Sequence, residues 1–151
     1  MVKNLPLFEA PGGILTSTQT TGNQWDAPFG WAPLQLIAVD GLRRYGYRAD
    51  ADRVARKFIA LVTKEFEEHS GIVEKYDVKR RESDVAADIR FGYSANQVGF
   101  GWTNGVVLEL LAGLEHKPAK AAARALSAPR ARAWAGAGPP PRAAAAPAPS
   151  R

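Results

Sequence analysis

The stretch from Gly22 to Gln35, GNQWDAPFGWAPLQ, constrains the fold of this chain more than any other part of its sequence. Pro28 and Pro33 each remove a backbone donor and fix φ, so the segment is predicted to be a loop that enters a helix near Pro33. Two tryptophans offer flat apolar faces, and the amide and carboxylate side chains offer planar hydrogen-bonding groups, a mixture that suits a neutral, hydroxyl-rich ligand such as a sugar. Composition alone leaves an alternative open, in which the tryptophans fill a core and the amides cap the backbone.

Four blocks of sequence carry a resemblance to a known family. The pattern QWDxPxGWxPxQ occupies residues 24–35, and PGG precedes it at residues 11–13. Downstream, VEKYDV occupies residues 73–78 and GFGWTNGV occupies residues 99–106. In these four blocks, and in their order and spacing, the chain resembles the trehalase family of glycoside hydrolases. The resemblance covers residues from about 11 to 115.

The fold that this resemblance implies is all-α, namely the C-terminal part of an (α/α)6 barrel with long loops and a sugar site in the loops at one end. Such a barrel needs several hundred residues, whereas this chain has 151. The spacing of its apolar residues predicts three helices, two of them capped by polar residues at their starts. The predicted helices run from Pro33 to about Tyr45, from Asp50 or Asp52 to about His69, and from Thr103 or Asn104 to Glu115.

Each predicted helix carries apolar residues at helical spacing, which are expected to face the core. In chain order these sets are Leu34, Ile37, Val39, Leu42 and Tyr45, then Val54, Phe58, Leu61, Val62 and Phe66, then Val106, Val107, Leu110, Leu111 and Leu114. The third set is wide, so its helix is expected to be substantially buried. Glu65, Glu67 and Glu68 are expected on the solvated side of the second helix, because charged side chains are rarely buried. Residues 1–22 and 79–96 are expected to be mostly extended or looped.

Glu74, in the VEKYDV block, is the strongest catalytic candidate. From the residues alone it would be a surface carboxylate paired with Lys75 or with an arginine. In trehalase-like enzymes, however, the glutamate of this block is the catalytic general base, and the resemblance assigns that role to Glu74. These enzymes invert the anomeric configuration, which requires a second carboxyl group that acts as general acid.

The general acid has no counterpart in this sequence. In the family it is an aspartate well upstream of the QWD block, and nothing before Gly22 matches that region. The family's first signature, PGGRFxExYxWD, is also absent, since the PGG at residues 11–13 belongs to a later block. The chain is therefore expected to be a truncated fragment that is inactive alone.

The resemblance and the chemistry of the side chains together nominate a set of substrate-binding residues: Gln24, Trp25, Asp26, Trp31, Tyr93, Phe100 and Trp102. Without the resemblance, Phe100 and Trp102 would be assigned to the core, where large aromatic residues commonly pack. Family members often carry a GGGEY run whose glutamate contacts substrate. Here the aligned stretch is GYSANQV, with Tyr93 near the glutamate position, and Asp88 is a spatial alternative.

The composition changes abruptly after residue 116. Residues 117–151 are almost entirely Ala, Pro, Arg and Gly and contain seven basic and no acidic residues, so they are expected to form a disordered tail. The net charge of +5 belongs to this tail, because residues 1–116 carry a net charge of −2. The expected domains are thus a catalytic part at residues 1–116 and a tail at residues 117–151. The tail is either a weak arm for nucleic acid or acidic surfaces or an unselected extension.

Composition also limits cofactors and compartment. Cysteine is absent and only two histidines are present, which argues against a thiolate or histidine-rich metal site, so no metal and no cofactor are expected. No apolar run is long enough for a signal peptide or a membrane span. The chain as it stands is expected to be cytoplasmic, although an upstream segment of a longer enzyme could carry a periplasmic signal.

Three functions remain in order of preference. The first is a trehalase-like hydrolase of α,α-trehalose, with the rest of the enzyme as a protein partner. The second is a non-catalytic carbohydrate-binding or complementing subunit that uses Trp25, Trp31 and Trp102 as stacking platforms. The third is a basic-tailed nucleic-acid binder, which is disfavoured because, apart from Trp134, the aromatic residues lie outside the basic tail. No nucleic-acid or membrane partner is therefore expected.

Overall fold

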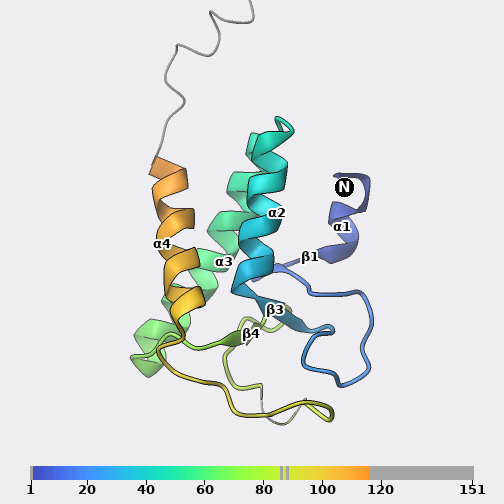
Figure 1. Cartoon of the computed structure of the whole chain (residues 1–151), viewed down its shortest axis with the longest axis vertical. Helices are drawn as coiled ribbons and strands as arrows, with labels where there is room; N and C mark the ends of the chain where they lie inside the picture. Colours follow the sequence, from blue (N-terminus) through green and yellow to red (C-terminus); the bar gives the residue numbers. More distant parts are fainter. Residues whose placement is uncertain (1, 86, 88, 116–151) are drawn as a thin grey trace, which may run out of the picture. The chain divides into compact units, whose positions relative to one another are not determined.

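A computed structural model describes residues 2–85, 87 and 89–115 of the chain. The chain divides into two units, residues 1–117 and 118–151, and all the described residues belong to the first. Figure 1 shows the order of the helices and strands. They are η1 (Val2–Asn4), α1 (Leu5–Phe8), β1 (Glu9–Ala10), β2 (Gly13–Ile14), β3 (Phe29–Trp31), α2 (Ala32–Arg44), α3 (Arg48–His69), β4 (Lys75–Asp77) and α4 (Gly101–Glu115). The expectation of a disordered tail at 117–151 lies outside the described residues.

The fold is largely helical but not strictly all-α, which corrects the predicted fold class. β1 and β2 form one antiparallel pair, with the turn at Pro11 and Gly12 between them. β3 and β4 form a second antiparallel pair, in which Trp31 lies opposite Lys75. Such short strands carry no long periodic pattern, so the motif residues gave no signal for them. They matter because β3 brings the QWD segment beside the VEKYDV segment.

The three predicted helices are confirmed, but they begin earlier than expected. α2 starts one residue before Pro33, which takes the early helical position that tolerates a missing N–H. α3 starts at Arg48, so neither predicted aspartate is its cap. α4 starts at Gly101, which places Thr103 inside its first turn.

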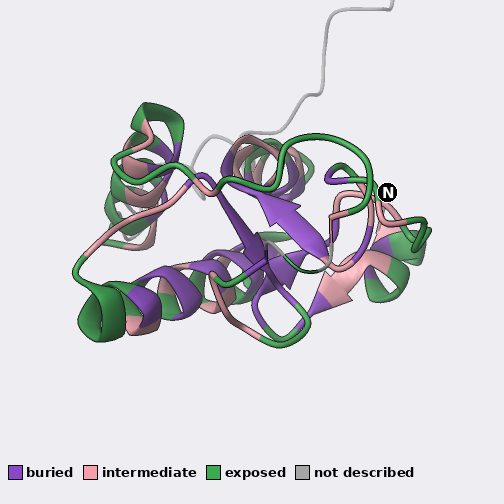
Figure 2. Ribbon diagram, turned by 90° about the horizontal axis from the view of Figure 1, so that it is seen from below, coloured by how far each residue is buried: buried purple, intermediate pink, exposed green. Residues whose placement is uncertain are grey.

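α2, α3 and α4 pack against one another, and their shared interior forms the main core (Figure 2). The predicted α3 stripe is buried except for Phe66, which is half-exposed. On α2, Val39 and Leu42 are buried, whereas Ile37 and Tyr45 are exposed. Ile37 lies on the exposed side of α2 and Tyr45 directly follows its last residue, so only part of the predicted stripe faces the core.

The expectation that α4 is substantially buried is wrong. Val106 and Leu110 are buried against the other helices, but Leu108 is 67% exposed and Leu111 is 40% exposed. Among the helices of the described part of the chain, α4 packs mainly against α2 and α3. Its apolar residues extend around more of the helix than these two neighbours cover.

Glu65 also differs from the prediction, because its side chain is only 2% exposed. Its Oε1 accepts a hydrogen bond from Lys64 Nζ at 2.6 Å, and its Oε2 accepts one from the backbone N–H of Ser83 at 2.8 Å. Burial by itself would raise the pKa of Glu65, but the hydrogen bonds from Lys64 and Ser83 outweigh burial and lower it. The carboxylate thus attaches the turn after β4 to the end of α3. Glu67 and Glu68 are exposed, as predicted.

The segments predicted to be looped are partly ordered. Residues 2–8 form η1 and α1, which the sequence analysis did not predict. The described residues of 79–96 contain no named helix or strand, but Glu82 bridges to Asp77 and Phe91 bridges to Asn23. None of the helices in the described part of the chain is both long and apolar enough to span a membrane.

Candidate functional site

Glu74 lies immediately before β4, and its side chain is 1% exposed. Because β4 pairs with β3, this carboxylate is held at the edge of the segment that carries Trp31. The first turn of α4 contacts the backbone of Glu74, because Thr103 Oγ1 donates a hydrogen bond to the Glu74 carbonyl oxygen at 3.4 Å. The VEKYDV, QWD and GFGW blocks therefore meet at this residue.

Two side chains engage the Glu74 carboxylate. The Tyr93 hydroxyl donates a short hydrogen bond to Oε1, and Lys75 Nζ lies 3.3 Å from Oε2. The hydrogen bond to Glu74 raises the pKa of Tyr93 to about 12, because it stabilises the neutral phenol beside a negative charge. The predicted pairing of Glu74 with Lys75 is therefore confirmed. The expectation that Glu74 is a surface residue is wrong, because its side chain is only 1% exposed.

Lys75 has a fully buried side chain, with 0% exposure. Its Nζ donates a hydrogen bond to the Ala95 carbonyl oxygen at 2.8 Å and lies 4.1 Å from the centroid of the Tyr93 ring. The same ammonium lies 5.4 Å from the centroid of the Trp31 ring. Lys75 thus connects the candidate base to the aromatic residues of the site.

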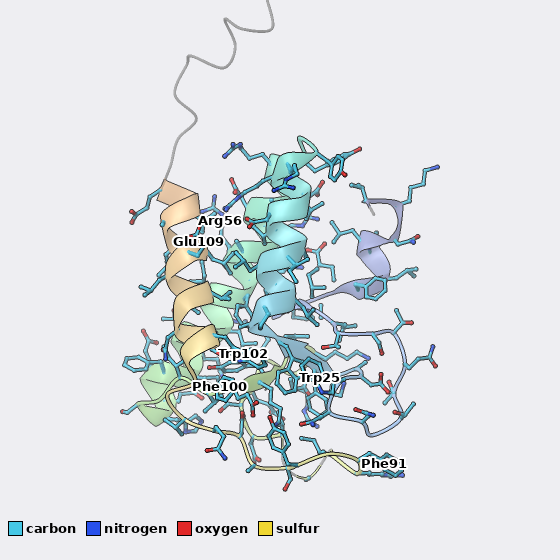
Figure 3. All side chains as sticks on the ribbon, in the orientation of Figure 1. Trp25, Arg56, Phe91, Phe100, Trp102 and Glu109 are labelled. Carbon is cyan, nitrogen blue, oxygen red and sulfur yellow. The ribbon has the colours of Figure 1, made fainter. Side chains whose placement is uncertain are left out.

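The aromatic residues of the QWD and GFGW blocks form one cluster. Trp25 stacks on Trp31 with centroids 3.9 Å apart and planes 9° apart, and Trp102 meets Trp31 edge-on at 5.6 Å. Phe100 packs against Trp102 at 4.8 Å. Figure 3 shows Phe100 and Trp102 at the lower end of α4, with Trp25 toward the same end of the helices.

The three tryptophans have different environments. Trp31 is 1% exposed, and its Nε1 donates to the Gln24 carbonyl oxygen at 2.8 Å, so it fills the centre of the cluster. Trp25 is 45% exposed and Trp102 is 37% exposed. Only these two therefore offer open ring surface to a ligand. For Trp31, the alternative of a core role describes its contacts better.

Gln24 and Asp26 behave differently from each other. The Gln24 side chain is 91% buried, and its Oε1 has no hydrogen-bond partner among the described residues. The two oxygens of Asp26 accept hydrogen bonds from the hydroxyls of Thr21 and Ser17. These bonds, with the bond from Thr21 the stronger, lower the pKa of Asp26. Asp26 thus organises its own loop, whereas Gln24 keeps an acceptor available.

The structure brings most of the sequence-predicted residues into one region: Glu74 with Tyr93, and Trp25, Trp31, Phe100 and Trp102 with one another. Asp77 is buried close by in sequence, but Oδ1 accepts the N–H groups of Lys79 and Arg80 and Oδ2 pairs with Arg80. Asp88 lies outside the described residues.

Sequence reasoning missed two residues that shape the site. The sequence singles out Lys75 only as a partner of Glu74, although its place inside the VEKYDV block is a usable signal. Asn96 was not considered, yet its side chain bonds both the N–H and the C=O of Lys75 and the carbonyl of Ser83. Nothing local in the sequence marks that contact, because the partners are 21 and 13 residues away.

Among the described residues, the one cluster of potential metal ligands is already bonded to a lysine. Within the described part of the chain, one group has potential ligand atoms close enough to hold an ion, namely Glu65, Glu68 and His69. The ammonium of Lys64 already bonds both carboxylates, at 2.6 Å and 3.2 Å. This arrangement neutralises the acidic pair with a lysine, and it lies at the end of α3.

Comparison with known proteins gives consistent relationships. A family model described as Trehalase matches residues 2–115. The chain is 50% identical over 112 residues to a periplasmic trehalase of Xanthomonas oryzae, covering 74% of this chain and 19% of that protein. It is 39% identical over 120 residues to a cytosolic neutral trehalase of Emericella nidulans, covering 69% and 16%. The structure resembles neutral trehalase Nth1 from Saccharomyces cerevisiae with a TM-score of 0.57 and 36% identity, covering 83% of this chain and 21% of that one.

The chain spans about one fifth or less of the length of the relatives it matches. The matched region contains every described residue, including Glu74 and the aromatic cluster. On the extent of the family match and the identity to its members, this chain belongs to the trehalase family.

Proposed function

We propose that Glu74 is the general base of an inverting hydrolysis of α,α-trehalose to two glucose molecules. The observation that carries this proposal is the position of Glu74. Glu74 is a buried carboxylate that accepts a hydrogen bond from Tyr93 and pairs with Lys75. The ammonium of Lys75 lies near the Trp31 ring, which packs between the partly exposed Trp25 and Trp102. Membership of the trehalase family supports the choice of substrate.

The chemistry needs two carboxyl groups on opposite sides of the scissile bond. Glu74 takes a proton from a water molecule as the water oxygen bonds to the anomeric carbon. The glycosidic carbon–oxygen bond breaks in the same step, and a general acid donates a proton to the leaving oxygen. In inverting enzymes the two carboxyl groups lie roughly 6.5–9.5 Å apart, which leaves room for the water.

The aromatic residues would bind the sugar rings. Trp25 and Trp102 have open faces on which the C–H surface of a glucose ring can stack. Gln24 Oε1 is a buried acceptor without a partner among the described residues, so a sugar hydroxyl that reached it would satisfy its hydrogen-bonding capacity. Tyr93 and Phe100 would border the same site. For Asp26 we propose an indirect role, in which it shapes the loop that carries Trp25.

We further propose that this chain is the C-terminal part of an (α/α)6 barrel and that the remaining part supplies the general acid. The exposed apolar side chains of Ile37, Leu108 and Leu111 would then pack against other helices of the barrel. One carboxylate cannot act as base and acid in the same step, so residues 1–151 alone should be inactive. A non-catalytic carbohydrate-binding role is the second candidate, because the open faces of Trp25 and Trp102 suit it equally well.

Reconstitution tests the catalytic proposal. Residues 1–151 would be combined with the upstream part of a trehalase from a relative, and glucose release from trehalose would be measured. Glu74→Gln keeps the size of the side chain but cannot accept the proton, so kcat should fall by about 10²–10⁴-fold with little change in KM. Glu67→Gln, a matched change at an exposed position of α3, should leave both constants unchanged.

One result would contradict the assignment of Glu74 as the base, and another would contradict the need for a second part. Near-full turnover in Glu74→Gln, combined with loss of turnover in Asp77→Asn or Asp88→Asn, would show that another carboxylate is the base. Clear glucose release by the wild-type chain alone, well above that of its Glu74→Gln variant, would show that no second part is needed. Trehalose binding without any turnover in the reconstituted protein would favour the carbohydrate-binding role.

A further inference from the structure

Lys75 is the unusual residue of this site, because a charged ammonium with 0% exposure has lost all contact with solvent. Removing such a charge from water is costly unless partners within the protein replace the lost hydration. An apolar side chain of similar length would fill the same space without this cost. The ammonium group therefore needs an explanation beyond packing.

The contacts of the Lys75 ammonium supply that explanation. Nζ lies 3.3 Å from Glu74 Oε2 and donates to the Ala95 carbonyl oxygen at 2.8 Å. The face of the Tyr93 ring lies 4.1 Å from Nζ, within the range of a cation–π contact. The hydroxyl of the same tyrosine donates to the other oxygen of Glu74. Each oxygen of the Glu74 carboxylate thus has one partner, Lys75 or Tyr93, and these two partners also contact each other.

The main chain of Lys75 is fixed as well. Its N–H donates to Asn96 Oδ1 at 3.1 Å, and its carbonyl oxygen accepts from Asn96 Nδ2 at 2.9 Å. Because these two hydrogen bonds hold the backbone of Lys75 in place, its ammonium group can keep the Glu74 carboxylate in one orientation. Tyr93 alone could not do so, because its ring is 48% exposed and rests on the ammonium.

We propose that Lys75 is a positioning residue for the base, holding Oε2 of Glu74 so that Oε1 stays directed at the Tyr93 hydroxyl. This role rests on the proposed function of Glu74. Lys75 does not touch substrate or the attacking water. It acts through Glu74, and the loop at residues 93–96 is fixed by the same ammonium.

The first test uses NMR of the chain itself and needs no activity. The ¹⁵Nζ–Hζ signal of Lys75 should exchange slowly with water and be shifted upfield by the Tyr93 ring, unlike the signal of the exposed Lys79. Glu74→Gln should move the Lys75 ¹⁵Nζ signal, whereas Glu67→Gln should leave it in place. Rapid exchange like that of Lys79, or no response to Glu74→Gln, would overturn the proposal.

A second measurement uses Lys75→Met, with Lys79→Met as the matched control at an exposed position. Without the cation, the buried Glu74 carboxylate is uncompensated and should leave its position beside Tyr93. The downfield hydroxyl proton signal of Tyr93, identified by its loss in Tyr93→Phe, should then disappear in Lys75→Met and persist in Lys79→Met. A folded Lys75→Met chain that kept this signal would overturn the proposal, and a variant that failed to fold would leave the decision to the first test.

In the reconstituted enzyme, Lys75→Met should lower kcat by about tenfold to a hundredfold with KM changed by less than about twofold, because a misplaced base slows the chemical step. If Lys75→Met lowered the melting temperature but left kcat unchanged, the role of Lys75 would be purely structural. The two proposals fail separately. If Glu74→Gln keeps its turnover while the NMR results hold, Lys75 positions a carboxylate that is not the base.

Discussion

Both functional atoms of the Gln35 amide are hydrogen-bonded to the backbone of Ile14. Gln35 Nε2 donates to the Ile14 carbonyl oxygen at 2.7 Å, and Gln35 Oε1 accepts from the Ile14 N–H at 2.7 Å. The Gln35 side chain is fully buried. It therefore joins the first turns of α2 to β2, and the surrounding glycines leave room for it. A Cβ at Gly13 would lie 2.5 Å from Gln35 Oε1, and one at Gly30 would lie 3.1 Å from Gln35 Nε2 and 2.4 Å from Val78.

Gln35→Leu should destabilise the fold strongly. The change leaves one buried donor and one buried acceptor of Ile14 without partners, and each unsatisfied group costs about 1–3 kcal/mol. We expect the free energy of unfolding to fall by roughly 2–6 kcal/mol in urea denaturation followed by circular dichroism. Gln19→Leu, the same change at an exposed position, should cost less than about 0.5 kcal/mol. Equal effects of the two changes would contradict the role of Gln35.

An acid titration of stability should reveal the ion pairs of Glu9. Arg53 contacts both carboxylate oxygens, at 2.8 Å and 2.9 Å, and Lys57 Nζ lies 2.7 Å from Oε1. Hydrogen bonds from Arg53, then from Lys57, outweigh burial and lower the pKa of Glu9 from 4.5 to about 2. A carboxylate with a lowered folded-state pKa adds stability above pH 4.5 and loses it as the pH falls from 4.5 toward 2.

The size of this effect is limited, because Arg53 is about half-exposed and water screens the pair. We expect about 1 kcal/mol of the wild-type free energy of unfolding to disappear across that pH range through Glu9. Urea denaturation at a series of pH values would show the difference between wild type and Glu9→Gln shrinking toward pH 2. A difference that stayed constant from pH 6 to pH 2.5 would argue that Glu9 is not ion-paired in the folded chain.

The helices could be predicted because their periodic apolar residues are a local signal. α3 is the best case, since Val54, Phe58, Leu61 and Val62 are all buried as expected. Periodicity does not reveal how much of a helix its neighbours will cover. Leu111 belongs to the apolar set predicted to face the core and is nevertheless 40% exposed.

The burial of single charged residues could not be predicted, because it depends on partners that are distant in sequence. Glu65 is covered through its bond to the N–H of Ser83, 18 residues later, and Glu74 is covered by Tyr93, 19 residues later. The VEKYDV motif identified Glu74 as a candidate only through its resemblance to a family. The enclosure by Lys75 and Tyr93 came from the structure.

Removal of residues 117–151 should leave the rest of the chain unchanged. This segment contains Leu126 and Trp134 as its only large apolar residues, too few to bury much surface. We expect the helical circular dichroism signal per molecule and the melting temperature of residues 1–116 to match those of the full chain within about 2 °C. A drop of 5 °C or more on truncation would show that the segment packs on the helices.

Trp31→Ala should cost much more stability than Trp25→Ala, although both residues belong to the QWD block and their rings are stacked. Trp31 is 1% exposed and packs between Trp25 and Trp102, so Trp31→Ala should remove roughly 3–5 kcal/mol of stability. Trp25 is 45% exposed and has only one face covered by Trp31, so Trp25→Ala should cost about 1 kcal/mol. Urea denaturation of the chain alone would separate these values.

The effect of Trp25→Ala should appear instead in substrate binding. The lost stacking is worth about 0.5–1.5 kcal/mol, which corresponds to a rise in KM for trehalose of roughly twofold to tenfold in the reconstituted enzyme. kcat should change little, because a ring that stacks on the sugar would contact it in both the ground state and the transition state. Tyr45→Ala removes another exposed aromatic ring, at the C-terminal end of α2, and should leave KM unchanged. If Trp25→Ala lowered kcat as severely as Glu74→Gln while KM stayed constant, Trp25 would act on the reacting centre, and its role as a stacking surface would have to be abandoned.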